Sequence, residues 1–324
     1  MADELRLGTR GSQLALWQAN TVAARIAAAG GPPCRLVVIK TSGDRLQDAP
    51  LSEVGGKRLF VKEIEDALTR GEIDLAVHSS KDMPVILPEG LRIAGVLPRE
   101  DARDAVILPA DGGQGMSVDD LVSRLGSAPR IGTSSVRRTA QLARLFPGAS
   151  FLPIRGNLGT RLRKLDGGEY DALVLASAGL IRLQQHARIS ASLPIAACVP
   201  VPGQGIIAVE VREQDAHVAA AVAAIDDARA RAALDAERAV VVTLGGGCQM
   251  PIGAHAAVGS SALRLTAIVL SLDGKRTIRA ESRGAEHEAA RLGTTVAEDL
   301  LSGGAAEILA EVQQAHAAVE GIQP

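Results

Sequence analysis

The first hundred residues alternate short apolar runs with segments of helical spacing. Apolar, strand-like runs occupy residues 5–8, 35–40, 74–80 and 91–97, and helical spacing covers residues 12–29 and 59–70. Ser12 stands where its hydroxyl can cap the first of these helices. Alternation of this kind is typical of an α/β layer fold with a mostly parallel sheet.

A second stretch repeats this order. Ser117 and Asp120 have the spacing of a capping box, and strand-like runs follow at residues 130–132, 151–155 and 172–176, with helical spacing at 134–145 and 157–165. Gly8-Thr9 and Gly132-Thr133 each follow a short strand and precede a helix. The repeat predicts two similar lobes, with a ligand held between them beyond the carboxyl ends of the strands.

The remainder predicts a third, smaller domain. Residues 200–205 are rich in turn formers, and residues 206–211 form a strand that could rejoin the first sheet. An alanine-rich helix is predicted over residues 216–242, strands over 263–272 and 275–282, and helices from about residue 286. We therefore expect one lobe from residues 1–98 and 202–222, a second from 99–201, and an α+β domain from 223–324. Residues 41–58 are polar and hold Gly and Pro, so they predict a mobile loop.

Composition narrows the class of ligand. The 324 residues carry a net charge of −2 and only three Phe, one Trp and one Tyr, which argues against a nucleic-acid binder. Three widely spaced cysteines predict neither a disulfide framework nor a metal site. The chain shows no signal peptide and no apolar run long enough to cross a membrane, so we expect a cytoplasmic protein.

Arginines gather where strands give way to helices. Such junctions hold Arg10, Arg137, Arg138, Arg155 and Arg161, and less clearly Arg182, beside the hydroxyls of Ser12, Thr133, Ser134 and Ser135. Guanidinium groups next to helix-start N–H groups form anion sites. The alternative, surface salt bridging, is favoured for Arg144, Arg163, Arg229 and Arg231. The cluster predicts a ligand with several carboxylates or phosphates.

Two further segments could carry chemistry. Cys248 follows three glycines, which could present its thiol, although an incidental cysteine in a tight turn fits equally well. Ser79, Lys81 and Asp82 follow a strand; Asp82 could stabilise a cation or move a proton, or form a solvated pair with Lys81. We expect Cys34 and Cys198 to be small core residues and His78 to be a packed strand residue.

Taken together, these segments resemble the porphobilinogen deaminase (hydroxymethylbilane synthase) family from Arg6 to beyond Ala310. The matching stretches are residues 9–18, 54–57 with 59–60, 76–84, 132–138, 155–162, 168–172, 202–205 and 246–249. The resemblance implies an enzyme that joins four porphobilinogen molecules into hydroxymethylbilane with release of ammonia, in tetrapyrrole biosynthesis. It also implies two lobes like those of periplasmic binding proteins, a small third domain, and a monomer that binds neither nucleic acid nor membrane.

The resemblance assigns roles to the candidate residues. It implies a dipyrromethane cofactor joined by a thioether to Cys248 and held by Lys81, Ser79, Ser135, Arg137 and Arg138. It makes Asp82 the catalytic carboxylate, beside the azafulvene cation left when ammonia departs. Pyrrole carboxylates and rings would meet the substrate set, Arg10, Ser12, Thr133, Ser134, Arg155, Arg161, Arg182 and Phe60, and residues 41–58 would be a lid.

Two small departures and two rival functions accompany this resemblance. Arg58 stands where the family commonly has glycine, and Gly245 where an acidic residue is frequent. A non-catalytic anion-binding protein of the periplasmic type would fit the fold and the arginines, but it would not need Cys248 and Asp82. An enzyme acting on a phosphorylated metabolite would use the same helix starts without needing Cys248.

Overall fold

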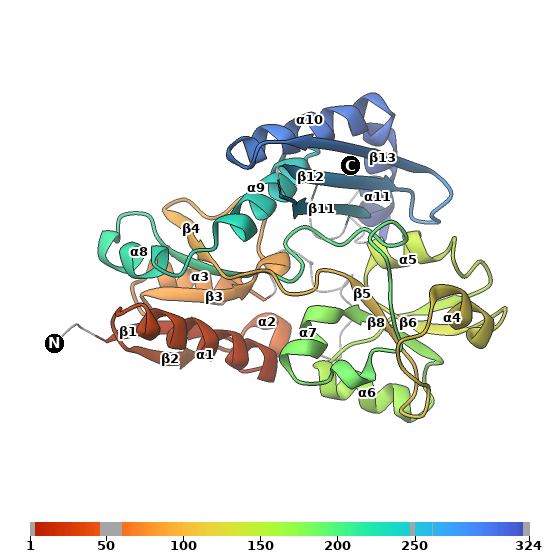
Figure 1. Ribbon diagram of the computed structural model, residues 1–324, viewed down its shortest axis with the longest axis horizontal. Coiled ribbons are helices and arrows are strands. Elements are labelled where there is room, and N and C mark those ends of the chain that lie inside the picture. Colours follow the sequence, from red (N-terminus) through yellow and green to blue (C-terminus); the bar gives the residue numbers. More distant parts are fainter. Residues whose placement is uncertain (1–3, 46–59, 247–249, 261, 320–324) are drawn as a thin grey trace.

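Three sheets form the framework of the chain. The computed structural model describes residues 4–45, 60–246, 250–260 and 262–319. Its strand orders are β2-β1-β3-β10-β4, β7-β6-β8-β5-β9 and β11-β12-β13, and the small third sheet lies against both larger units (Figure 1). The predicted fold class is confirmed: two α/β lobes accompany a small α+β unit.

The first sheet combines parallel strands with one antiparallel strand. It consists of β1 (Leu5–Thr9), β2 (Cys34–Val38), β3 (Leu75–Ser79), β4 (Leu91–Val96) and β10 (Ile207–Arg212), flanked by α1 (Gln13–Ala28), α3 (Lys62–Thr69) and α8 (Ala216–Ala223). Strand β10 pairs antiparallel with both β3 and β4, as expected for a strand that rejoins this sheet. Leu7 and Leu75 pack in one core with Val22 of α1, so this sheet is buried by helix α1.

The second sheet has the same arrangement. It consists of β5 (Asp104–Ile107), β6 (Arg130–Gly132), β7 (Ser150–Leu152), β8 (Ala172–Ala176) and β9 (Ala191–Ser192), with α4 (Val118–Leu125), α5 (Val136–Leu142), α6 (Leu158–Asp166) and α7 (Ser177–Arg182). Strand β5 is antiparallel to β8, as β10 is to β3. The chain therefore crosses between the lobes twice, before β5 and before β10, and these crossings position the site.

Several element bounds differ from the predictions. Strands β5, β9 and β11 (Ile252–Val258) were not predicted. The helix predicted over residues 216–242 was wrong, because the chain turns between α8 and α9 (Ala228–Thr243). Asp226 accepts a hydrogen bond from Val96 N at 2.7 Å, and Asp227 caps α9 by accepting from Ala230 N at 2.7 Å. These carboxylates bind backbone N–H groups more favourably outside a helix than within one.

Part of the predicted loop at residues 41–58 is helical. Ser42–Arg45 forms the short helix α2, while residues 46–59 lie outside the described part of the chain. Asp44 accepts hydrogen bonds from Thr41 N at 3.2 Å and Thr41 Oγ1 at 2.8 Å, and Ser42 N donates to Glu63 at 2.8 Å. These contacts fix the start of the segment against α3.

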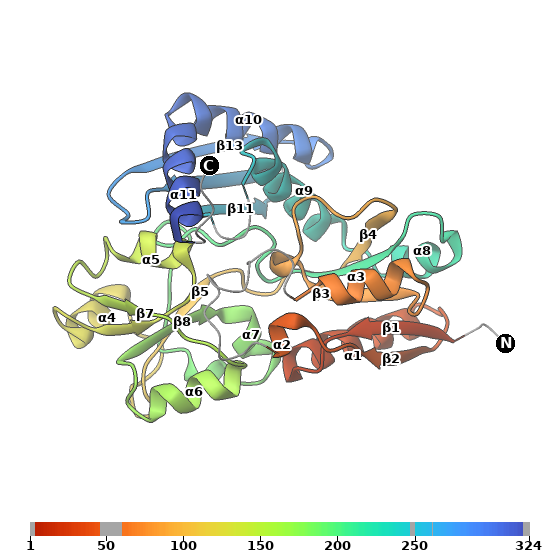
Figure 2. The same cartoon turned by 180° about the vertical axis from the view of Figure 1, so that it is seen from behind.

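The third sheet is covered on one face by helices and on the other by the second lobe. Helices α9, α10 (Ala289–Ser302) and α11 (Ala305–Val319) pack on β11, β12 (Leu263–Leu270) and β13 (Thr277–Gly284) (Figure 2). The opposite face sets Ile268 and Leu270 against Ala140 of α5. Gly274 has φ +71°, and a Cβ there would lie 2.1 Å from Ala140 O. Only glycine permits this close approach to α5.

One buried carboxylate ties the third domain to both crossings. Glu237 of α9 has no exposed surface and forms an ion pair with Arg99, which lies before β5. Its oxygens also accept from Gly203 N and Ala256 N, each at 2.7 Å. Because Gly203 precedes β10 and Ala256 lies in β11, Glu237 joins the two crossing segments to the C-terminal sheet.

Glu237→Gln should destabilise the fold strongly. The amide would present a donor to backbone N–H groups and leave the largely but not fully buried Arg99 without its counter-ion, a change that costs about 3–5 kcal/mol. Urea denaturation measures the loss. The control is Glu72→Gln, whose partner Arg70 is on the surface and whose loss should stay within about 0.5 kcal/mol. Equal, small losses in both variants would contradict the role given to Glu237.

Candidate functional site

Lys81 and Asp82 of the first lobe lie within electrostatic reach of the arginines of the second. Both residues follow β3 in the short 3-10 helix Ser80–Asp82, where Asp82 is exposed. Burial lowers the pKa of Lys81 to about 8; Asp82 opposes this shift, and Arg138 adds to it. Among the described residues Lys81 has no ion-pair partner within 4 Å, so it is an unneutralised cation.

Two arginines that follow β7 complete this cationic group. Burial lowers the pKa of Arg161 to about 10, Arg138 adds to the shift, and Asp82 opposes it. Arg161 Nε donates to Gly156 O at 2.8 Å, which orients the guanidinium. Burial also lowers the pKa of Arg155, and its Nη2 is buried without a hydrogen-bond partner among the described residues. A buried, unpaired guanidinium edge is the feature that an anionic ligand satisfies.

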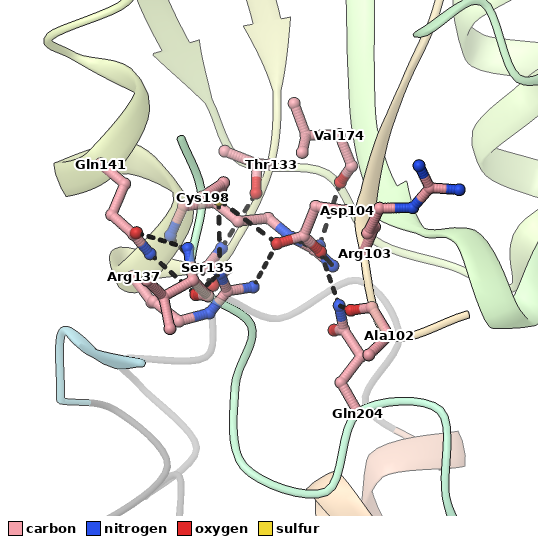
Figure 3. A network of polar contacts seen from close by, with 12 residues as sticks. Ala102, Arg103, Asp104, Thr133, Ser135, Arg137, Gln141, Val174, Cys198 and Gln204 are labelled. Atoms are coloured by element: carbon pink, nitrogen blue, oxygen red, sulfur yellow. Dashed lines mark hydrogen bonds and ion pairs between the residues drawn. The ribbon is translucent and has the colours of Figure 1, made fainter. Parts of the chain in front are cut away.

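Arg137 and Arg138 share one buried carboxylate (Figure 3). Asp104 Oδ2 accepts from Arg137 Nη2 at 2.8 Å, and Oδ1 accepts from Arg138 Nε and Nη2 at 3.0 and 2.7 Å. Gln204 Nε2 donates to Oδ1 at 2.9 Å. Burial alone would raise the pKa of Asp104, but the two guanidinium groups hold it well below its usual range. The cationic site thus includes one buried carboxylate of the protein itself, that of Asp104.

Asp104 was missed by sequence reasoning. The local signal was a single acidic residue at the head of the apolar run 105–108. A second signal was the pair Arg137-Arg138, because two adjacent arginines cannot both be buried without a counter-charge. Neither signal identifies the partner, since 33 residues separate Asp104 from Arg137.

The hydroxyls of the second lobe brace the turn that presents the arginines. Ser134 Oγ donates to Ile154 O at 2.7 Å and accepts from Ile154 N at 2.9 Å. Thr133 Oγ1 accepts from Ser135 N, and Ser135 Oγ caps α5 by accepting from Arg138 N. These side chains lie beside Arg137 and Arg138, and much of their hydrogen-bonding capacity is used by the backbone.

The first lobe brings Arg10, Phe60 and Asp44 together. The Arg10 guanidinium carbon lies 4.3 Å from the centre of the Phe60 ring, and its Nη2 forms an ion pair with Asp44 at 2.5 Å. Asp44 belongs to α2, so Arg10 holds the start of the 41–58 segment against β1. Nearby, Ser12 caps α1 by accepting from Ala15 N at 3.3 Å, as predicted.

Two further contacts place predicted residues. Gln18 of α1, which sequence reasoning did not single out, donates to Ser79 Oγ at 2.9 Å. Arg182 of the second lobe donates to Gly205 O at 2.7 Å and lies 5.7 Å from the ring centre of Trp17 in the first lobe. Burial lowers the pKa of Arg182 to about 10. Arg182 therefore bridges the lobes.

The remaining predictions have mixed outcomes. Cys248 lies outside the described residues; α9 ends at Thr243, five residues before it. Cys198 is buried, as predicted, and burial raises the pKa of its thiol to about 12. Cys34 is half-buried at the edge of the first core. His78 is buried, as predicted, and its Nε2 lies 3.1 Å from Glu210.

Comparison with known proteins places the chain in a family. Residues 5–220 match the family described as porphobilinogen deaminase, dipyromethane cofactor binding domain, and residues 232–302 match its C-terminal domain. The chain belongs to the porphobilinogen deaminase family. It is 46% identical over 318 residues to the porphobilinogen deaminase of Geobacter metallireducens, covering 98% of this chain and 97% of that protein.

A second relative and one solved structure were also compared with the chain. The porphobilinogen deaminase of Syntrophobacter fumaroxidans is 44% identical over 312 residues, covering 96% of this chain and 98% of that protein. The periplasmic VFT2 domain of BvgS from Bordetella pertussis aligns with 68% of this chain and 86% of its own, at 14% identity and a TM-score of 0.41. In the described part of this chain, no helix is long and apolar enough to span a membrane.

The lowered pKa of Lys81 predicts a pH dependence of stability. Folding disfavours the charged amine, so the penalty is present below pH 8 and is relieved as pH rises from about 8 toward 10.5. In the ligand-free protein, the stability of wild type relative to Lys81→Met should increase by about 1 kcal/mol between pH 7.5 and 9. Urea unfolding at both pH values measures this difference. The exposed Lys62 provides the control, Lys62→Met, and a flat difference for Lys81→Met would contradict the shift.

Proposed function

We propose that this enzyme joins porphobilinogen molecules head to tail into hydroxymethylbilane with release of ammonia, starting from a dipyrromethane primer attached to Cys248. The observation that carries the proposal is the excess of positive charge at the site. Five cationic side chains, Lys81, Arg137, Arg138, Arg155 and Arg161, act with two carboxylates, Asp82 and Asp104. A growing chain of pyrroles, each with an acetate and a propionate, supplies the missing negative charge.

The described residues fit a dipyrromethane. Its carboxylates match Lys81, which lacks an ion-pair partner in the described part of the chain, and the remaining N–H groups of Arg137 and Arg138. Ser79 and Ser135 add hydroxyls. When bound, the cofactor supplies the pyrrole carbon to which the first substrate is joined. The attachment to Cys248 is part of the proposal.

Substrate recognition is assigned to the remaining cations and to Phe60. Arg155 Nη2, buried and without a hydrogen-bond partner among the described residues, and the desolvated guanidinium of Arg161 would bind substrate carboxylates, each charge-assisted bond contributing about 1.5–3 kcal/mol. Arg10 and Arg182 would join them, with donors from Ser12, Thr133 and Ser134. Phe60, already stacked by Arg10, offers a ring face to the pyrroles.

Asp82 is assigned the catalytic role. Its carboxylate is exposed, within electrostatic reach of Lys81 and Arg161. When ammonia leaves the substrate, positive charge develops on the pyrrole, and a carboxylate beside the ring nitrogen stabilises it. The same carboxylate can then hold the proton that the new carbon–carbon bond releases. We further propose that the enzyme works as a cytoplasmic monomer, with lobes of residues 1–98 with 202–222 and 99–201, and a cofactor-carrying domain of 223–324.

The cofactor and its attachment point can be tested together by intact mass. Wild type should exceed its sequence mass by two porphobilinogen units less two ammonias, and Cys248→Ser should show no excess. Cys34→Ser is the matched control and should keep the excess. An unmodified wild type that gains no mass with porphobilinogen would contradict the proposal.

Asp82→Asn should separate folding from turnover. Because the side chain is exposed, the unfolding midpoint should stay near that of wild type, while kcat falls by about 100-fold or more. Steady-state formation of hydroxymethylbilane measures kcat. The surface variant Asp119→Asn, on α4, should keep full activity. Asp82→Asn turning over at the wild-type rate would remove this residue from the mechanism.

A further inference from the structure

Asp104 has an unusual position for a carboxylate near an anion site. It has no exposed surface, begins β5, and lies where the chain first crosses from one lobe to the other. Both of its oxygens are occupied, by two guanidinium groups, by Gln204 and by the thiol of Cys198 at 3.3 Å. It therefore cannot itself bind ligand or substrate.

Its contacts fix the orientation of both arginines. Arg137 donates to Val199 O at 2.7 Å on one side and to Asp104 on the other. Arg138 donates to Val174 O at 3.0 Å through Nη1 and to Asp104 through Nε and Nη2. Each guanidinium is thus held at two edges, and N–H groups remain on both. A fork fixed in this way binds a carboxylate without first losing side-chain freedom.

The charge balance distinguishes Asp104 from a simple structural brace. A brace would neutralise what it holds, whereas one carboxylate here faces two guanidinium groups. Asp104 thus reduces the repulsion between the two adjacent guanidinium groups. The three side chains together still carry a net positive charge. This residual charge acts together with Lys81, which has no ion-pair partner in the part of the chain that the structure describes, to attract a ligand anion.

We propose that Asp104 is a positioning residue, which holds Arg137 and Arg138 in the geometry that binds the cofactor carboxylates before the cofactor arrives. This inference rests on the proposed function for the identity of the ligand. The claim that the arginine pair is preorganised for an anion is independent of the proposed function.

Asp104→Asn tests the inference with two readouts. The first is the fraction of purified protein that carries the cofactor mass, expected to fall about 10-fold or more. The second is the melting temperature in sodium phosphate against sodium chloride of equal ionic strength. With the counter-ion removed, the gain in melting temperature on replacing chloride by phosphate should be about 5 °C larger for the variant than for wild type. A merely structural defect would lower the melting temperature equally in both salts.

The control is Asp101→Asn, a nearby carboxylate that pairs with the half-exposed Arg103. It should match wild type in cofactor content and show the same difference in melting temperature between the two salts as wild type. Asp104→Asn with cofactor content within twofold of this control, or with the same phosphate-minus-chloride difference in melting temperature as this control, would overturn the inference.

Asp104→Glu covers the case in which Asp104→Asn does not fold. It keeps the charge but displaces the oxygens by one methylene, so cofactor content should fall about threefold or more, while overpacking by the added methylene lowers the melting temperature by roughly 2–10 °C. Unchanged cofactor content would overturn the inference. If wild type itself neither carries nor acquires the cofactor mass, the proposed function fails, while the phosphate comparison still decides the role of Asp104.

Discussion

The structure depends on holding like charges together in a desolvated place. Positive groups from two lobes converge, and burial together with the neighbouring Arg138 disfavours the charge of Lys81 and of Arg161, as their lowered pKa values record. Asp104 offsets part of this cost from within the fold. An anionic ligand can offset the remaining electrostatic cost, and this cost therefore contributes to the affinity of the ligand-free site for carboxylates.

The two crossings make this convergence possible. Because β5 and β10 are each inserted antiparallel into their sheets, the ends of β1, β3, β6 and β8 face one region from two lobes. Glu237 ties both crossings to the C-terminal domain, and Gly274 brings the same domain against α5, which carries Arg137 and Arg138. The domain proposed to carry the cofactor is thus in contact with the elements that would bind it.

Sequence reasoning singled out the cationic side chains and Asp82, but not the carboxylates that pair with the arginines. Arg10, Arg137 and Arg155 were found because strand–helix junctions are visible in the local pattern. Asp44, the partner of Arg10, and Asp104, the partner of Arg137, were not found. The two residues of each pair are 34 and 33 positions apart, so their contact depends on the topology. A local sequence pattern cannot select one carboxylate among many, because the choice depends on where the chain crosses between the lobes.

The fold was predicted well where periodicity is strong and poorly where single contacts decide. The strands of the two large sheets were found, apart from β5 and β9. The alanine-rich stretch was predicted as one helix, although Asp226 and Asp227 offered a local stop signal that the apolar pattern outweighed. Cys248 and residues 46–59 lie outside the described chain, so their assignments stand on family resemblance alone.

The central claim is that this cationic site holds a chain of pyrroles that grows while attached to the protein. Intact mass after brief incubation with limiting porphobilinogen tests it most directly. We expect a ladder of covalent species, successive members differing by one porphobilinogen less one ammonia. Product formation without any covalent mass increase would contradict it.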